Sequence, residues 1–280
     1  MEQEYANRPT KERPSAKNRA KKSLGQHFLI DKQAIARIVG AIPAGATAIE
    51  IGPGPGAITL TLLERVSALT VIEMDDRFAN RWQEVADSKP SLSVVHGDVM
   101  KELTSTVTQA QPQWIAGNLP YNLSGPLTAM LAAIPLVGGM VLMYQREVAE
   151  RICADPGSKI YGGLSVLVRH HYDVKRLLTL PPGAFSPPPK VHSAVVLLTP
   201  HHHTPPCDYA ILQQTVRKGF AHRRKTIFNN FRGFLDADGF NAIDINPGIR
   251  PEQMDYAAWA RLALRLQANQ DHLNTDNAKQ

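Results

Sequence analysis

The chain has 280 residues, 43% of them hydrophobic, so it is long enough for a large α/β domain with a smaller appendage and too apolar for wholesale disorder. The formal net charge is +6 at pH 7, and no apolar stretch approaches the length of a membrane span. Cys153 and Cys207 stand in unrelated contexts, which excludes a disulfide framework and a zinc knuckle. We therefore expect a cytoplasmic protein without a membrane segment.

Basic residues gather in two separate blocks. Residues 1–22 are polar and contain prolines, and between residues 8 and 22 seven basic residues accompany one acidic residue. The second block consists of Arg217, Lys218, Arg223, Arg224, Lys225 and Arg232. Because each phosphate that a protein neutralises releases condensed counterions, two such blocks indicate a polyanionic partner. Charge that is merely exposed to solvent explains them equally well at this point.

Short apolar runs alternate with amphipathic segments along the first half of the chain. Asp31 precedes a helical pattern that ends near Pro43. Strands are predicted at 48–51, 69–72, 92–95, 113–116 and 140–143, each followed by polar or glycine-containing residues. Buried parallel strands joined by crossover helices have this pattern, so we expect a doubly wound, Rossmann-like α/β sheet. Such sheets bind their ligands at the carboxyl ends of the strands.

The pattern changes after Pro181. The prolines within 185–190 exclude a helix and a central strand, whereas 192–199 alternates as a strand that we expect to pair with 174–180. This hairpin would add antiparallel strands to the edge of the parallel sheet. Beyond residue 208 only helices are predicted, at 209–220, 226–236 and 256–267. The predicted organisation is a basic flexible arm (1–22), a cofactor-binding domain (23–200), a small all-α domain (201–267) and a flexible tail (268–280).

A glycine-rich turn, Glu50-Ile51-Gly52-Pro53-Gly54-Pro55-Gly56, follows the first predicted strand and lets a ligand approach the backbone. Glu73 ends the second strand, where a carboxylate can bind both hydroxyls of a ribose. Asp98 ends the third, where it can accept from an adenine amino group or simply cap the next helix. These residues suit a nicotinamide cofactor or S-adenosylmethionine, but the Gly-x-Gly-x-Gly spacing departs from that of pyrophosphate-binding loops.

The stretch after the fourth strand, Gly117-Asn118-Leu119-Pro120-Tyr121-Asn122, points to chemistry on adenine. The exocyclic nitrogen of adenine is a poor nucleophile because its lone pair is delocalised into the ring. The side-chain oxygen of Asn118 and the carbonyl of Leu119 can both accept from this amine and localise the lone pair toward a methyl donor. Pro120 fixes the backbone, and Tyr121 can stack on an extruded base. Positioning supplies much of the rate, so no metal is required.

These motifs resemble those of the small-subunit ribosomal RNA adenine dimethyltransferases, the family linked to kasugamycin sensitivity, from Lys22 to about Gln267. The matching stretches are Gly25-Gln26-His27-Phe28-Leu29, Glu50-Ile51-Gly52-Pro53-Gly54, Val71-Ile72-Glu73, Gly117-Asn118-Leu119-Pro120-Tyr121-Asn122, Ala184-Phe185-Ser186-Pro187-Pro188-Pro189-Lys190-Val191 and Phe220-Ala221-His222-Arg223-Arg224-Lys225-Thr226. The resemblance implies a class I methyltransferase that uses S-adenosylmethionine. It also implies N6,N6-dimethylation of two adjacent adenosines in a hairpin near the 3′ end of 16S rRNA, during assembly of the small ribosomal subunit.

The resemblance also implies roles for single residues. The implied cofactor contacts are His27, Leu29, Gly52, Gly54, Glu73, Asp98 and Asn118. His27 departs from members that have asparagine there, so a side-chain and a backbone contact are both open. The implied catalytic residues are Asn118, Leu119, Pro120, Tyr121 and Phe185. Phe185 would face Tyr121 across the flipped adenine, or else pack under the proline loop. The implied rRNA contacts are Arg223, Arg224 and Lys225, unless these form a solvated helix face.

Three other interpretations stay open. The related macrolide-resistance family methylates large-subunit rRNA, although the Phe-x-x-Arg-Arg-Lys-Thr match and the C-terminal helices favour the small subunit. A non-catalytic assembly or transcription factor would keep the fold and only bind, against which the intact Glu73, Asp98 and Asn118 argue. A nicotinamide-dependent dehydrogenase leaves the aromatic residue after Pro120 and both basic blocks unexplained. No metal site is expected, since three adjacent histidines at 201–203 cannot converge on one ion, and a monomer suffices.

Overall fold

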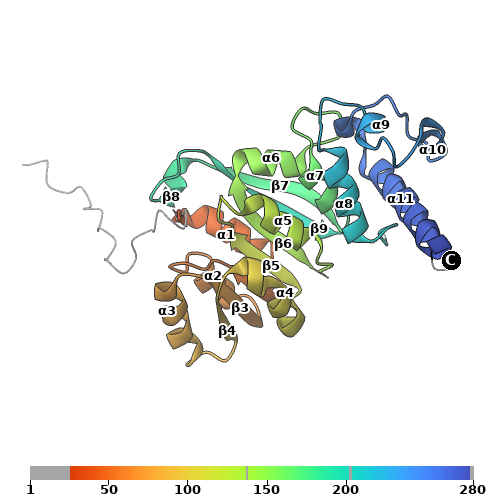
Figure 1. Cartoon of the computed structure of the whole chain (residues 1–280). Coiled ribbons are helices and arrows are strands. Elements are labelled where there is room, and N and C mark those ends of the chain that lie inside the picture. Colours follow the sequence, from red (N-terminus) through yellow and green to blue (C-terminus); the bar gives the residue numbers. More distant parts are fainter. Residues whose placement is uncertain (1–25, 137, 202–203, 278–280) are drawn as a thin grey trace, which may run out of the picture.

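A seven-stranded sheet with the order β4-β3-β2-β5-β6-β9-β7 forms the centre of the computed structural model (Figure 1). The structure describes residues 26–136, 138–201 and 204–277, so the predicted basic arm lies outside the described residues. The strands are β2 (Thr47–Ile51), β3 (Ala68–Glu73), β4 (Leu92–His96), β5 (Trp114–Asn118), β6 (Gly139–Gln145), β7 (Tyr172–Leu180) and β9 (Ser193–Pro200). Strands β2 to β6 are parallel, and β9 is antiparallel to both β6 and β7. The predicted parallel sheet and its antiparallel edge hairpin are confirmed.

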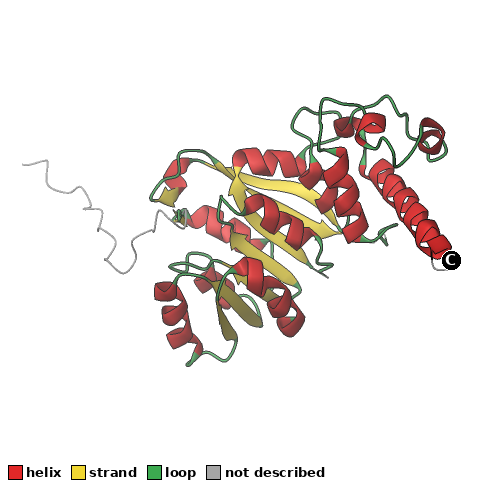
Figure 2. Cartoon of the chain, in the orientation of Figure 1, coloured by secondary structure: helices red, strands yellow, loops and turns green. Residues whose placement is uncertain are grey.

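Helices cover both faces of this sheet (Figure 2). On one face lie α1 (Lys32–Gly40), α2 (Thr59–Leu63) and α3 (Asp76–Ala86). On the other lie α4 (Val99–Ala110), α5 (Ser124–Ala132), α6 (Arg146–Cys153) and α7 (Gly163–Val168). Neighbouring strand residues point to opposite faces, so Ala48 packs into the first core cluster and Ile49 into the second. Burial on both faces explains why the predicted strands are continuously apolar rather than alternating.

Aspartate side chains cap the N-termini of three of these helices. Asp31, Asp75 and Asp98 are the N-caps of α1, α3 and α4, and each side chain accepts a hydrogen bond from a backbone N–H of the first helical turn. Such caps stabilise a helix by roughly 1 kcal/mol each. The caps fix where each helix leaves the edge of the sheet at which the strands end.

The C-terminal helices lie at the end of the molecule that is remote from β4 (Figure 1). They are α8 (Tyr209–Gly219), α9 (Ile227–Asn230), α10 (Ala237–Asn241) and α11 (Tyr256–Asn277). A single helix was predicted at 226–236, but only α9 forms there. The chain turns after α9, and Gly233 within this turn has a φ of +84°. Helix α11 runs past Gln267, where we expected a frayed tail, since no glycine or proline interrupts 268–277. Their core cluster also includes Tyr161 and Val166, so the helical region packs directly on the α/β part.

A second, two-stranded sheet ties the beginning of the described chain to the proline-rich loop. Strand β1 (Phe28–Leu29) pairs antiparallel with β8 (Phe185–Ser186), and a 3-10 turn, η3 (Pro182–Ala184), precedes β8. The backbone N–H of Ile30 also donates to the carbonyl of Ala184 over 2.8 Å. Proline is compatible with a short edge strand such as β8, although it is excluded from a central strand. Within the part of the chain that the structure describes, no helix has the length and apolar character needed to cross a membrane.

The pairing of β2 with β5 leaves no room for a side chain at Gly117. A Cβ atom at Gly117 would lie 2.8 Å from the carbonyl oxygen of Ile51 on the neighbouring strand. We expect Gly117→Ala to lower the free energy of unfolding by about 1–3 kcal/mol, as overpacking of a core does. Urea denaturation measures this change. Gly183→Ala is the matched control because a Cβ there meets no atom within 4 Å, and equal stabilities of the two variants would contradict the prediction.

Candidate active site

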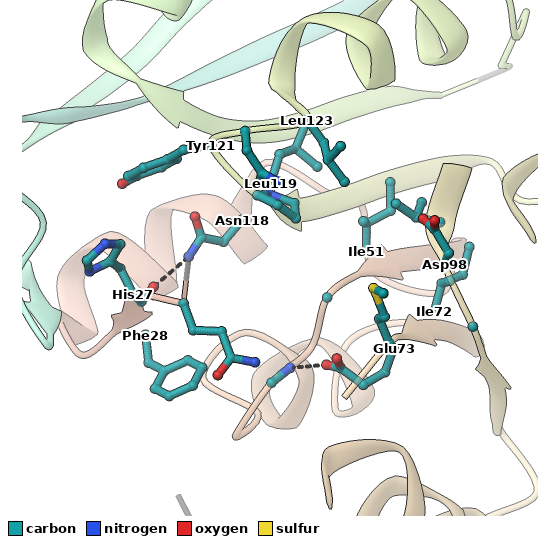
Figure 3. Close-up of a pocket in the computed structure, with 18 residues that line it drawn as sticks. His27, Phe28, Ile51, Ile72, Glu73, Asp98, Asn118, Leu119, Tyr121 and Leu123 are labelled. Carbon is teal, nitrogen blue, oxygen red and sulfur yellow. Dashed lines mark hydrogen bonds between the residues drawn. The ribbon is translucent and has the colours of Figure 1, made fainter. Parts of the chain in front are cut away.

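A cavity of about 360 Å³ opens at the carboxyl ends of β2, β3, β4 and β5 (Figure 3). Nine of the predicted site residues line it: His27, Gly52, Gly54, Glu73, Asp98, Asn118, Leu119, Pro120 and Tyr121. They come from five separate segments of the chain, and the fold alone brings them together. The cavity therefore lies where a doubly wound sheet binds its ligand.

The glycine turn and Glu73 form one hydrogen-bonded unit. Gly52 and Gly54 have φ angles of +66° and +50°, which favour glycine over any residue with a side chain. One carboxylate oxygen of Glu73, Oε2, accepts from the N–H of Gly54 over 2.9 Å, and Oε1 accepts from the N–H of Asp75 over 2.8 Å. Burial raises the pKa of Glu73, while these backbone donors oppose that rise. These backbone donors hold the carboxylate of Glu73 in place at the cavity, which the residue lines.

Asp98 caps a helix, which is one of the two roles considered from the sequence, and it also stands at the cavity. Its Oδ1 accepts from the N–H of Met100 over 2.9 Å and caps α4, and the residue also lines the cavity. Figure 3 shows Asp98 beside Ile51 and Ile72, across the cavity from Asn118 and His27. The cap fixes the position of the carboxylate, which leaves its second oxygen for a ligand.

Asn118 and Tyr121 are each held by a residue that is distant in the sequence. The Nδ2 of Asn118 donates to the carbonyl of His27 over 2.9 Å. The reversed amide would place two oxygens against each other, so this contact fixes Oδ1 as the free acceptor. The Oη of Tyr121 shares a hydrogen bond of 2.7 Å with the Oγ of Ser193, and its ring is stacked on that of His27 with the centroids 5.7 Å apart. Burial raises the pKa of Tyr121, so the phenol stays neutral.

Two predicted residues do not line this cavity. The side chains of Leu29 and Phe185 are 4% and 2% exposed, and both belong to the core cluster that also contains Ala184. Their strands, β1 and β8, pair directly, and this pairing turns both side chains into the core. Leu29 lines only a small neighbouring cavity of about 30 Å³. For Phe185 the structure matches the alternative in which the ring packs under the proline loop.

The three predicted rRNA contacts differ in their surroundings. The Nη2 of Arg223 donates to the carbonyls of Lys159 and Tyr161, over 3.1 Å and 2.7 Å. Arg224 and Lys225 are exposed. Arg223 therefore links the helical region to the loop before α7, whereas its two neighbours extend into solvent.

Sequence motifs pointed to only part of the lining. The further lining residues are Gln26, Phe28, Ile51, Ile72, Met74, Gly97, Val99, Asn122 and Leu123. All lie within a few positions of a predicted residue, so proximity in the sequence was the available signal. Ser193 stands 72 residues from its partner Tyr121, and no motif connects the two.

The charge of the lining limits which ligands the cavity fits. Its acidic residues are Glu73 and Asp98, and none of the described lining residues is a lysine or an arginine. A pyrophosphate would find no cationic partner here, whereas a sulfonium cation would be attracted by both carboxylates. Ile51, Ile72 and Val99 provide apolar contacts for a purine ring. Among the described residues, no group of three histidines, cysteines or acids is arranged to hold a metal ion.

The family model of the ribosomal RNA adenine dimethylases matches residues 17–268. The chain belongs to the ribosomal RNA adenine dimethylase family. Membership confirms the predicted class of enzyme, an adenine dimethyltransferase that depends on S-adenosylmethionine. This dimethylase is 45% identical over 255 residues to the ribosomal RNA small subunit methyltransferase A of Xanthomonas euvesicatoria, a match that covers 87% of this chain and 95% of the relative. The Xanthomonas oryzae protein of the same name is 44% identical over 252 residues, with the same coverage.

Two solved structures share the fold of this dimethylase. The dimethyladenosine transferase from Plasmodium falciparum superposes with a TM-score of 0.75 at 24% identity, covering 86% of this chain and 98% of that one. The 23S rRNA methyltransferase ErmE superposes with a TM-score of 0.64 at 22% identity, covering 86% of this chain and 99% of that one. At such identities the likeness establishes the architecture, including the helical C-terminal part.

Glu50 should make the stability of the dimethylase depend on pH. Its side chain is 2% exposed, and its Oε2 has no hydrogen-bond partner among the described residues. Burial raises the pKa of Glu50 from 4.5 to about 8. Between these values the folded protein holds a proton that the unfolded chain has released, so stability should fall as the pH rises through this window.

We expect Glu50→Gln to remove this loss, because the amide does not ionise. The melting temperature of the variant minus that of the wild type should increase as the pH is raised from 5 to 8.5. Thermal denaturation across that range measures this difference. Glu84→Gln, on the exposed side of α3, is the matched control. A difference between Glu50→Gln and the wild type that stays constant with pH would contradict the prediction.

Proposed function

We propose that this dimethylase transfers two methyl groups to each of two adjacent adenosines in a hairpin near the 3′ end of 16S rRNA, while the small subunit assembles. The observation that carries the proposal is the fixed amide of Asn118, whose Oδ1 remains available to the amine of an adenine at the cavity. The substrate class is supported by relatives that are about 45% identical over 95% of their length and are named as small-subunit methyltransferases. The fold of ErmE, at 22% identity, gives no equal support for a large-subunit substrate.

We propose that Gly52, Gly54, Glu73 and Asp98 hold S-adenosylmethionine. The cavity fits this cofactor because its two carboxylates complement a sulfonium cation, and because a Cβ at Gly52 would enter open space in the cavity. When bound, the cofactor supplies a methyl group activated by the sulfonium. Glu73 would accept from the ribose hydroxyls and Asp98 from the adenine amino group. Leu29 can contribute only through its main chain, since its side chain is buried in the core.

We propose that Asn118, Leu119, Pro120 and Tyr121 position the target base. The Oδ1 of Asn118 and the carbonyl of Leu119 would accept from the two N–H groups of the amine. This arrangement favours a pyramidal nitrogen, whose lone pair is then localised, and orientation of that kind supplies much of the rate. Pro120 fixes the backbone, and the neutral ring of Tyr121 would stack on the base. Stacking of Phe185 on the base stays an untested prediction, and the ring is buried in the core in this structure.

We propose that the helical region from residue 201 binds the rRNA and that the side chains of Arg224 and Lys225 contact its phosphates. Both are exposed, and phosphate contacts of this kind position a nucleic acid without reading its sequence. Arg223 would contribute mainly by fixing this surface to the carbonyls of Lys159 and Tyr161. The proposed substrate places the enzyme in the cytoplasm. All proposed residues lie on one chain, so a monomer is sufficient.

The first test is methyl transfer from labelled S-adenosylmethionine to undermethylated small subunits, with protein-free large-subunit rRNA alongside. We expect N6,N6-dimethyladenosine in the small subunit only, identified by mass spectrometry of nucleoside digests. Asn118→Ala should lower turnover by roughly 100-fold or more, the loss seen when one positioned hydrogen-bonding group is removed. Cofactor binding by this variant, measured by calorimetry, should change much less.

Other outcomes would identify a different function. Tight binding to small subunits without transfer to either RNA would favour a non-catalytic assembly factor. Transfer to the large-subunit rRNA alone would favour the macrolide-resistance activity. Wild-type turnover by Asn118→Ala would remove Asn118 from the mechanism.

The rRNA surface is tested by the salt dependence of binding. Replacing both Arg224 and Lys225 with glutamate should weaken binding to small subunits and reduce the slope of log K against log salt by about one unit for each lost phosphate contact. Lys89→Glu, at the β4 end of the sheet, is the control with an equal change of charge per residue. Identical slopes for the double variant and the wild type would place these residues outside the interface.

A further inference from the structure

His27 contacts three parts of the site at once. Its carbonyl accepts from the Nδ2 of Asn118 over 2.9 Å. Its Nδ1 lies 2.9 Å from the carbonyl of Pro187 in the proline-rich loop. Its ring is stacked on that of Tyr121, with 5.7 Å between the centroids and 25° between the planes. Figure 3 shows His27, Asn118 and Tyr121 grouped on one side of the cavity, with Glu73 and Asp98 on the other.

The hydrogen bond to Pro187 shows which imidazole nitrogen is the donor. A carbonyl oxygen can only accept, so Nδ1 must carry the proton and donate it. A ring that is anchored to the loop at Nδ1 and stacked on Tyr121 cannot turn toward Glu73 without losing both contacts. The side chain of His27 is therefore committed to the end of the cavity that contains Asn118 and Tyr121.

We propose that His27 is a positioning residue for the target adenine and that its side chain is not a cofactor contact. The inference rests on the proposed function, because it assigns Asn118 and Tyr121 to the target base. His27 holds the acceptor, the stacking ring and the loop after β8 in one geometry. Residues 26–29 supply this connection because they pass between the end of β5 and the proline-rich loop, where β1 pairs with β8.

Loss of the imidazole should act on turnover more than on binding. Without it, Tyr121 loses the stacked ring and the main chain at His27, which holds Asn118, loses its anchor to Pro187. Misplacement of reacting groups by about 1 Å costs up to roughly 100-fold in rate, so we expect His27→Ala to lower kcat by about 10- to 100-fold. The dissociation constant of the cofactor should change by less than about threefold, since His27→Ala leaves Glu73 and Asp98 in place.

The second methyl transfer should be affected more than the first. An N6-methyladenine retains one N–H, so it can use only one of the two acceptors and depends more on stacking for its orientation. The product of His27→Ala should therefore shift from dimethyladenosine toward monomethyladenosine. A purely structural defect would lower the amount of active enzyme and leave this ratio unchanged when the variants are compared at equal total methyl incorporation.

The test compares three substitutions with a control on the same segment. His27→Ala removes ring and donor, His27→Phe keeps a ring without the donor, and His27→Asn keeps a donor without the ring. Ile30→Ala is the control, because that side chain is 56% exposed and its backbone bond to Ala184 is retained. For each variant, kcat and KM for undermethylated small subunits, the product ratio, the cofactor affinity by calorimetry and the melting temperature are measured.

We expect kcat to fall by about 10- to 100-fold for His27→Ala, by less for His27→Phe and His27→Asn, and to keep its wild-type value for Ile30→Ala. If cofactor affinity falls by the same factor as kcat, His27 is a cofactor contact and the inference is overturned. Wild-type kcat and product ratio in all three variants would also overturn it. If His27→Ala does not fold, the other two substitutions decide. Absence of methyl transfer by the wild-type enzyme would instead refute the proposed function, so the two failures are distinct.

Discussion

The parallel pairing of β2 with β5 is the constraint on which the site depends. The chain crosses from β2 to β3 on one side and later returns to place β5 on the other, so the loops that follow β2 and β5 leave the same edge of the sheet in opposite directions. The register sets Ile51 opposite Gly117, and the missing side chain at Gly117 lets the strands approach. One backbone contact thereby brings the glycine turn next to Asn118.

The N-terminal segment, residues 26–29, joins the two halves of this site. The Nε2 of Gln26 donates to the carboxylate of Asp75 over 3.1 Å, and the N–H of Asp75 donates to Glu73. One residue further, the carbonyl of His27 accepts a hydrogen bond from the side-chain amide of Asn118. A short stretch of chain thus connects the proposed ribose carboxylate with the proposed acceptor of the target amine. Since the pairing of β1 with β8 holds that stretch, the proline-rich loop belongs to the architecture of the site.

Two kinds of feature could be predicted from the sequence: elements with a recurring residue pattern, and turns that only certain residues can form. Parallel strands buried on both faces give apolar runs, and turns that need positive φ require glycine, so the sheet and the glycine turn were predictable. The helix that contains α9 was predicted too long, because helical periodicity continues past Asn230, where α9 ends, and past the turn at Gly233. The burial of Phe185 and the bond from Ser193 to Tyr121 follow from strand pairing between distant segments. Local patterns contain no information on such pairings.

The proposed function requires the target base to leave its RNA helix, and the distribution of charge offers a physical reason for this requirement. The cavity has two carboxylates and no described lysine or arginine in its lining, so an RNA phosphate is repelled from it. The exposed basic residues Arg224 and Lys225 lie in the C-terminal helical region, which under the proposed function would attract the same phosphates. A polyanion held at that surface and excluded from the cavity can present only a neutral group to Asn118. An extruded adenine is neutral, flat and able to stack on Tyr121, so the electrostatics that suit a cationic cofactor would also select a flipped base.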